Sequence, residues 1–355
     1  MTRVLMKGNE AVGAAAIKAG CRHFFGYPIT PQSEVPEYFA REMPKIGGCF
    51  LQAESEIAAI NMVYGAAGCG ARVMTSSSSP GISLKQEGIS YLAASELPCL
   101  IVNMMRGGPG LGSIQPSQTD YFQATRGGGN GDYRLIVLAP SNVQELVDLI
   151  IEGFDLADLY RTPVMVLSDG MVGQMMEPVD FDGNKKQYDL PSKEDWATVG
   201  TGEKRAPHII NSLYLEASIL EEHNLHLQKK FELIKENVCR VESEGLEGAE
   251  VVIAAYGTSA RIAKTAIETL TKEGYKVGLI RPITLWPFPY AEFDKVEDST
   301  KCIINFEMNH GQMIDDVRIG IKNRVPVEHF CRTGGVIPTP SELVTKVKEV
   351  LGGAK

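Results

Sequence analysis

The stretch LQAESEIAAINMVYGAAGCGARVMTSSSSPGISL, residues 51–84, decides the fold. It runs from a short apolar segment through two acids and a helix of small residues to an apolar strand and four serines. At about 100° per residue, Glu56 lies on the apolar face of that helix, whereas Glu54 falls on the opposite side. The shared face carries Ala59, Ile60, Val63 and Ala67. We therefore expect the Glu56 carboxyl to be buried.

A buried carboxyl needs a partner or stays protonated. Glu56 accordingly has two interpretations. It is a first-turn acid favoured by the helix dipole, or it is an acid held in place for proton chemistry. The spacing leaves both open, and we expect Glu54 to be structural.

The composition is typical of a soluble globular protein with about two domains. The 355 residues are 44% hydrophobic and 22% charged, and a net charge of −9 gives no footprint for nucleic acid. Seven scattered cysteines without a CxxC pair exclude an iron–sulfur binding run or a zinc knuckle in this chain. We expect a reduced, cytoplasmic protein with no signal peptide, no membrane span and no metal ligands of its own.

Strands and helices alternate with short connections along residues 1–176. The strands are nearly continuous apolar runs, which is typical of a parallel sheet covered by helices on both faces. Ligands of such sheets bind beyond the carboxyl ends of the strands. Three loops lie at such ends: residues 26–34, 76–81 and 104–133. Pro28 and Pro31 stiffen the first loop, so that it presents Thr30.

Residues 177–248 are polar and turn-rich, and we interpret them as a connector that docks on the first domain through one long helix. His223 and His226 on that helix have a spacing that could ligate a metal, but an exposed helix face is the interpretation we favour.

Residues 249–355 return to alternating strands and helices and predict a second, smaller α/β unit. Its RPITLWPFP segment, residues 281–289, is expected to be a stiff loop. His310 follows one of its strands, either as a structural or interfacial residue or as a functional one. The chain has no GxxxxGK[ST] loop, GxSxG turn or HExxH pair, which disfavours nucleotide hydrolysis, α/β-hydrolase chemistry and zinc proteolysis.

Four motifs in the right order resemble the alpha subunit of the 2-oxoacid:ferredoxin oxidoreductases. They are GYPITPQSE, the stretch quoted above, MMRGGPG with QPSQTDYFQATRGG, and GLIRPITLWPFP with EMNHGQ. The resemblance covers nearly the whole chain. In detail, SSSSPGISLKQEG and YGAAG look most like the branched-chain members, which act on 3-methyl-2-oxobutanoate (2-oxoisovalerate).

The resemblance implies a thiamine diphosphate enzyme that carries out oxidative decarboxylation. Such an enzyme converts a 2-oxoacid and coenzyme A into acyl-CoA and CO2 and passes two electrons to ferredoxin. Residues 1–176 would form the domain that faces the aminopyrimidine ring of the cofactor. Residues 249–355 would form a transketolase C-terminal-like domain.

By motif position, Glu56 matches the acid that bonds the pyrimidine nitrogen N1′ and so activates the cofactor. Arg106 matches the substrate-binding arginine, whose planar fork suits a 2-oxo carboxylate. Its alternative is a loop arginine that binds backbone carbonyls. Thr30 matches the threonine whose hydroxyl bonds the substrate, and its alternative is a helix N-cap.

The resemblance also implies that the loop at residues 76–81 walls the cofactor pocket. The implied cofactor contacts, besides Glu56, are Pro28, Ile29, Ser79 and Gly81. Ser79 stands where many relatives have glycine, so the contacts of that loop do not transfer directly.

Half of the cofactor site is missing from this sequence. Thiamine diphosphate enzymes hold Mg2+ and the diphosphate with a GDG motif followed by asparagines, and neither Asp169-Gly170 nor Asp182-Gly183 fits that pattern. We therefore expect a beta subunit to supply the diphosphate and Mg2+ site. A small iron–sulfur subunit would carry the electrons away, and the active site would lie at a subunit interface.

Two alternatives remain. The chain is a non-catalytic scaffold subunit that kept the fold, or it serves the same reaction on 2-oxoglutarate. A dicarboxylate would need a second cation at the far end of the pocket. The candidates for it are Lys85, Arg126 and Arg161.

Overall fold

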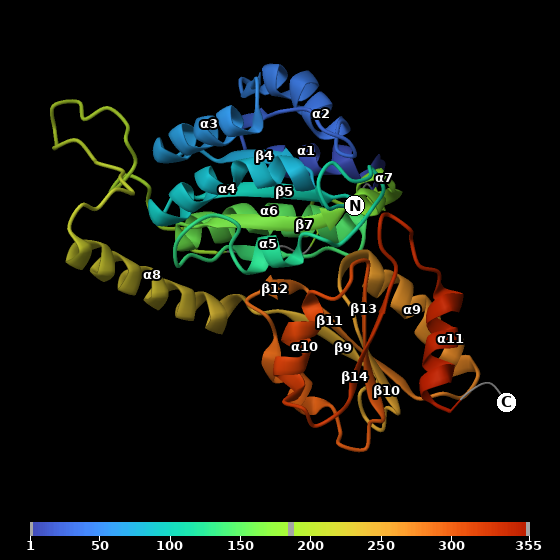
Figure 1. Ribbon diagram of the computed structural model, residues 1–355. Coiled ribbons are helices and arrows are strands. Elements are labelled where there is room, and N and C mark those ends of the chain that lie inside the picture. The colour runs from blue at the N-terminus through green and yellow to red at the C-terminus, as the bar shows by residue number, and fades with distance from the viewer. Residues whose placement is uncertain (1–2, 184–187, 353–355) are drawn as a thin grey trace.

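The computed structural model describes residues 3–183 and 188–352, which form two α/β units (Figure 1). The larger unit contains a seven-stranded sheet in the order β12-β6-β7-β5-β4-β2-β3. All neighbours pair in parallel except the edge strand β12, which is antiparallel to β6. The strands are β2 (His23–Gly26), β3 (Cys49–Gln52), β4 (Val73–Ser77), β5 (Cys99–Met105), β6 (Ile136–Leu138), β7 (Pro163–Asp169) and β12 (Thr284–Trp286).

Helices cover both faces of this sheet. Its central strands are therefore buried along their whole length. One pair of packed helices is α1 with α6, and another is α3 with α4. The helices are α1 (Gly8–Lys18), α2 (Glu34–Glu42), η1 (Met43–Ile46), α3 (Glu56–Gly68), α4 (Ser79–Ala94), α5 (Tyr121–Thr125), α6 (Val143–Tyr160) and α7 (Gly170–Gln174). Two short strands, β1 (Val4–Lys7) and β8 (Met176–Val179), pair antiparallel beside them. The predicted parallel sheet with helical cover is confirmed.

The smaller unit has a five-stranded sheet in the order β14-β13-β10-β11-β9. Its strands are β9 (Val241–Glu244), β10 (Val251–Ala254), β11 (Val277–Pro282), β13 (Cys302–Glu307) and β14 (Val327–Cys331). Its helices are α9 (Gly257–Lys272), η2 (Tyr290–Lys295), α10 (Met313–Ile321) and α11 (Pro340–Val350). The edge strand β9 pairs antiparallel with β11, so chain that precedes residue 249 already belongs to this sheet.

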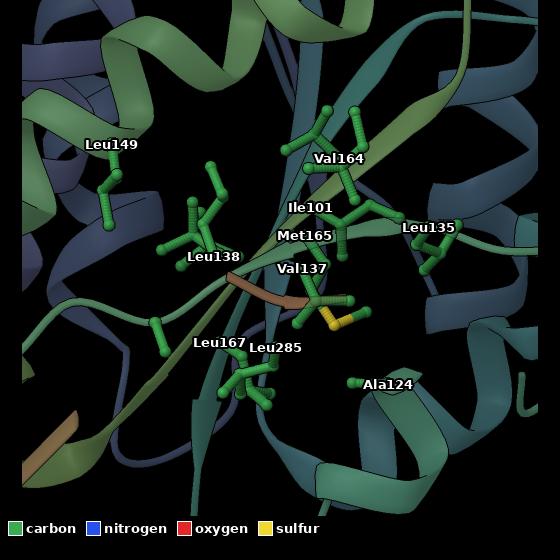
Figure 2. Close-up of a cluster of buried hydrophobic side chains, with 14 of the residues drawn as sticks. Ile101, Ala124, Leu135, Val137, Leu138, Leu149, Val164, Met165, Leu167 and Leu285 are labelled. Atoms are coloured by element: carbon green, nitrogen blue, oxygen red, sulfur yellow. The ribbon is translucent and has the colours of Figure 1, made fainter. Parts of the chain in front are cut away.

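The segment at residues 281–289 differs from the stiff loop that we expected of the smaller unit. Its strand β12 crosses to the larger unit and forms the edge of the seven-stranded sheet. Leu285 of β12 is 1% exposed and lies in a cluster of buried side chains with Val137 and Leu167 (Figure 2). The two units therefore share a hydrophobic core, which residues more than 100 positions apart build together.

Gln118 ties the two units by hydrogen bonds as well. Its fully buried side-chain amide donates to the backbone carbonyl of Tyr256 at 2.9 Å. The side-chain carbonyl accepts from Ser259 Oγ at 2.7 Å and from the backbone N–H of Met308 at 3.0 Å. A buried amide whose nitrogen and oxygen both bond the other unit fixes how the units sit together.

The connector loops away from the side of the larger unit before the long helix α8 (Ala217–Val238) (Figure 1). It docks as predicted: the backbone N–H of Thr198 donates to the carbonyl of Gly68 at 2.9 Å. His223 Nε2 bonds the backbone carbonyl of Ala94 at 2.7 Å. The exposed His226 contacts Glu96 at 3.0 Å. These two histidines therefore hold α8 against the first domain.

Candidate active site

The strand order β5-β4-β2-β3 brings the predicted site residues to one edge of the larger sheet. Thr30 follows β2, Glu56 follows β3, Ser79 follows β4 and Arg106 follows β5. Because the strands are parallel, all four residues lie beyond carboxyl ends. The parallel sheet alone accounts for their place along this edge.

Glu56 is the first residue of α3 and is 6% exposed. Ser55 caps the helix, its hydroxyl accepting from the backbone N–H of Ala58 at 3.2 Å. The residues predicted to share the face of Glu56 are all buried, and Glu54 is exposed. The prediction of a buried carboxyl on the apolar face is confirmed. Within the described part of the chain, the Glu56 carboxylate accepts no hydrogen bond.

Gly81 presses against this carboxylate. A Cβ atom at Gly81 would lie 2.7 Å from Glu56 Oε1 and 2.1 Å from Ser77 Oγ. Only glycine fits such a position without displacing its neighbours. The hydroxyls of Ser77 and Ser78 are buried and have no hydrogen-bond partner among the described residues. Unsatisfied buried hydroxyls beside an unpaired carboxylate are typical of a site that a polar ligand completes.

The connection after β4 differs from the predicted loop at residues 76–81. The strand continues to Ser77, a single residue follows, and α4 already begins at Ser79. Pro80 lies in the first turn of α4, where its fixed φ suits the helix and its missing N–H costs nothing. The first turn of α4, rather than a loop, therefore lies beside Glu56.

Ser79 is bonded inside the protein. Its hydroxyl donates to Asp120 Oδ2 at 2.6 Å, and the backbone N–H of Arg106 donates to Ser79 Oγ at 3.0 Å. Asn103 Nδ2 donates to the same Asp120 oxygen at 2.9 Å. Burial raises the pKa of Asp120, while these hydrogen bonds act to lower it. Ser79 thus links α4 to the loop that carries Arg106.

Asp120 is a site residue that our sequence analysis missed. The sequence offers one indication: Asp120 is the aspartate of QPSQTDYF, which lies in a long glycine-rich segment, and long loops are often functional. The side chain lines a cavity of about 700 Å³ together with Ser79 and His310. His310 is exposed and is contributed to this lining by the smaller unit.

Arg106 is buried, and its contacts are those of a loop arginine that binds backbone carbonyls, the alternative interpretation given above. Nη1 donates to the backbone carbonyl of Thr30 at 2.9 Å and Nη2 to that of Leu111 at 3.1 Å. Its Nε is buried with no partner in the described part of the chain. The arginine therefore joins the loops after β2 and β5, and its Nε–H group stays available to a ligand.

Thr30 is exposed in a turn, four residues before the first residue of α2. The nominal N-cap of that helix is Ser33, so Thr30 does not fill the N-cap role. Thr30 lines a second cavity, of about 540 Å³, with Gln174 and Ile337. Pro28 is exposed and Ile29 half-buried beside it.

The three cations considered for a second substrate carboxylate are all engaged elsewhere. Lys85 is fully buried, and its Nζ donates to Thr75 Oγ1 at 2.6 Å. Arg126 pairs with Asp316 of the smaller unit at 2.8 Å. Arg161 lies over the ring of Trp196, 4.5 Å from its centroid. Among the described residues, no group of three His, Cys, Asp or Glu side chains is arranged to hold a metal ion, and no helix could span a membrane.

Comparison with protein families now identifies the chain. Residues 14–242 match the model "pyruvate flavodoxin/ferredoxin oxidoreductase, thiamine diP-bdg". Residues 249–343 match the core domain II of pyruvate:ferredoxin oxidoreductase. The chain belongs to the 2-oxoacid:ferredoxin oxidoreductase family. The resemblance seen in its motifs is thereby confirmed.

Individual relatives of this 2-oxoacid:ferredoxin oxidoreductase chain agree. It is 49% identical to the ketoisovalerate oxidoreductase subunit VorB of Methanothermobacter thermautotrophicus over 99% of both chains. The 2-oxoglutarate:ferredoxin oxidoreductase of Magnetococcus marinus, solved with 2-oxoglutarate, coenzyme A and succinyl-CoA, matches with a TM-score of 0.84 at 33% identity. This chain spans 98% of its own length in that match but 65% of the solved chain.

A split-gene transketolase, solved as an inactive beta4 tetramer, shares the fold with a TM-score of 0.59 at 14% identity over 98% of both chains. The predicted thiamine diphosphate-type fold with a transketolase-like second unit is therefore confirmed.

The residues around Glu56 fit the aminopyrimidine end of thiamine diphosphate. Among the described residues the carboxylate has no hydrogen-bond donor, the buried hydroxyls of Ser77 and Ser78 are unsatisfied, and Gly81 puts no side chain against Glu56. A ring nitrogen and an amino group can satisfy such atoms. The fit does not extend to the diphosphate, because the sequence offers no GDG motif.

Proposed function

We propose that this chain is the subunit of a 2-oxoacid:ferredoxin oxidoreductase that supplies Glu56 to thiamine diphosphate. The enzyme would convert a 2-oxoacid, coenzyme A and two oxidised ferredoxins into acyl-CoA, CO2, two reduced ferredoxins and a proton. The observation that carries the proposal is the buried carboxylate of Glu56, which accepts no hydrogen bond among the described residues and lies so close to Gly81 that only glycine fits there.

The residues of this chain have three tasks. Glu56 holds a proton at the pyrimidine nitrogen, and the dry, rigid start of α3 keeps the carboxylate in place. Arg106 binds the carboxylate of the 2-oxoacid, with Nε free and the Nη donors able to exchange a backbone carbonyl for a charged oxygen. Thr30 offers its exposed hydroxyl to the same substrate. When bound, thiamine diphosphate supplies the carbon nucleophile and the electron sink for the loss of CO2.

The partner subunits follow from what this chain lacks. We assign the diphosphate and Mg2+ to a beta subunit, since this sequence has no GDG motif. We assign the electron path to ferredoxin to a small iron–sulfur subunit, since no CxxC pair is present here. The active site is then complete only at the subunit interface, inside a cytoplasmic complex.

We propose 2-oxoisovalerate as the preferred substrate. Identity to a ketoisovalerate oxidoreductase subunit, 49%, exceeds the 40% to the 2-oxoglutarate synthase subunit KorA of Archaeoglobus fulgidus. The full burial of Lys85 and the engagement of Arg126 and Arg161 elsewhere also argue against a dicarboxylate. A substrate series on the assembled enzyme tests this choice. The largest kcat/KM is expected with 2-oxoisovalerate, and a larger value with 2-oxoglutarate or pyruvate contradicts it.

The proposed role of Glu56 is tested by Glu56→Gln in the reconstituted complex. Loss of the proton-holding group should lower kcat roughly 100- to 10,000-fold. Glu54→Gln is the matched control, because Glu54 is an exposed acid two positions away and should keep normal turnover. Unchanged turnover in Glu56→Gln would instead support a scaffold subunit.

A further inference from the structure

Lys85 is a charged side chain with no exposed surface, in the second turn of α4. Lysine is almost never fully buried unless it is paired. In the described part of the chain, Lys85 forms no ion pair. Its Nζ donates instead to Thr75 Oγ1 at 2.6 Å and to the backbone carbonyl of Ser76 at 3.1 Å. Two neutral acceptors on β4 thus hold an ammonium group at a fixed place in the core.

That place is directly behind the candidate active site. Gly81 and Lys85 are four residues apart on α4 and therefore share one face of the helix. A Cβ at Gly81 would meet Glu56 Oε1 at 2.7 Å, and one at Gly88 would meet Ile60 Cγ2 at 2.5 Å. Lys85 lies between these two contacts, so it faces the first turn of α3, where Glu56 is located.

Few other charges act on this ammonium group. Glu56 faces it from α3, and the thiol of Cys99 faces it from β5. The thiol is neutral, because burial raises the pKa of Cys99 to about 12. Thr75 on β4 does not titrate, and Asp169, the buried acid of β7, is hydrogen-bonded by backbone N–H groups of α7 and by Thr258 of the smaller unit. Among these described neighbours, Glu56 carries the opposing charge.

The titration of Lys85 is consistent with this position. Burial lowers the pKa of Lys85 to about 7, and the negative charge of Glu56 acts in the opposite direction. Coupling between two opposite charges is reciprocal, so the ammonium group in turn stabilises the negative charge of Glu56.

We propose that Lys85 is a positioning residue for Glu56, whose ammonium group supplies the positive charge that keeps the Glu56 carboxylate ionised beside the cofactor site. This inference rests on the proposed function of Glu56. Helix α4 would then act on Glu56 in two ways, through the close approach that Gly81 allows and through the charge of Lys85. The charge reaches Glu56 from behind, so it leaves the side that faces the cofactor free.

Infrared difference spectroscopy of the assembled enzyme tests the inference without turnover. The carbonyl band of protonated Glu56 is the band that Glu56→Gln removes. In Lys85→Met, a neutral side chain of similar length fills the same space. The pH midpoint of the band should rise by about one unit or more, the change expected when an opposite charge is removed. Lys229→Met, at an exposed position of α8, should leave the midpoint unchanged.

An unchanged midpoint in Lys85→Met overturns the proposal. If that variant does not assemble, Glu56→Gln gives the reciprocal measurement without a change at Lys85. The pKa of Lys85 is lower in the folded chain than in the unfolded chain. At pH values between these two pKa values the unfolded chain binds more protons, so the free energy of unfolding rises with pH. Glu56→Gln removes the negative charge that raises the pKa of Lys85, so this rise should begin at a lower pH. A rise that begins at the same pH as in the wild type also overturns the proposal.

These results are separate from the test of the proposed function. Normal turnover in Glu56→Gln would contradict the role of Glu56 itself. Lost turnover in Glu56→Gln, with an unshifted carboxyl midpoint in Lys85→Met, would leave that role intact and remove Lys85 from it.

Discussion

The guanidinium group of Arg106 donates through Nη1 to the backbone carbonyl of Thr30 at 2.9 Å. Strand β4 separates the strands that these residues follow, so the bond spans the middle of the proposed site. Nε of the arginine stays buried without a partner among the described residues. A buried unpaired donor is costly, and a substrate carboxylate would relieve that cost.

Arg106→Lys should therefore raise KM for the 2-oxoacid and lower kcat/KM by roughly 10- to 100-fold, the loss of one or two charge-assisted hydrogen bonds. Steady-state kinetics of the assembled enzyme measure it. Arg205→Lys is the matched control, because Arg205 also donates to backbone carbonyls but lies in the connector. An unchanged KM would mean that Arg106 serves only to join the two loops.

Asp120 predicts a pH dependence of stability. Because its folded pKa is raised by burial, the folded chain binds more protons than the unfolded chain between the two pKa values. Stability then falls as pH rises through that window from the acidic side. Asp120→Asn cannot titrate and should lack this fall, which urea unfolding at a series of pH values measures. The same pH dependence in both proteins would contradict the raised pKa.

The shared core predicts that β12 stabilises the larger unit. Leu285→Ala should lower the free energy of unfolding by about 2–5 kcal/mol, the usual cost of a cavity in a packed core. Leu215→Ala is the matched control, since Leu215 is 90% exposed. Denaturant unfolding followed by tryptophan fluorescence measures both. Equal stability of the two variants would show that β12 does not contribute to the core.

Local patterns predicted much of the fold. The apolar runs and their short connections gave the parallel sheet, and the helical period alone placed Glu56 on the buried face of α3. The strand β12 was missed because three residues flanked by prolines carry little local signal, and their pairing with β6 is decided by contacts distant in sequence. The first turn of α4 lies inside the predicted loop at residues 76–81, since a run of serines resembles a loop.

The sequence predicted which residues belong to the candidate site better than it predicted the contacts between them. Parallel strands bring Thr30, Glu56 and Arg106 to one edge in any such sheet. The bonds of Arg106 to Thr30 and of Ser79 to Asp120 depend on loop geometry that no periodic pattern encodes. Lys85 likewise gives no signal in sequence, because a lysine in a helix is exposed far more often than buried.

The central claim is that Glu56 activates thiamine diphosphate, and the exchange of the cofactor's C2 proton with solvent deuterium tests it most directly. In the assembled enzyme with cofactor and no substrate, exchange should be fast in the wild type and in Glu54→Gln. It should be slower by roughly 100-fold or more in Glu56→Gln. Equal exchange rates in Glu56→Gln and the wild type would contradict the claim.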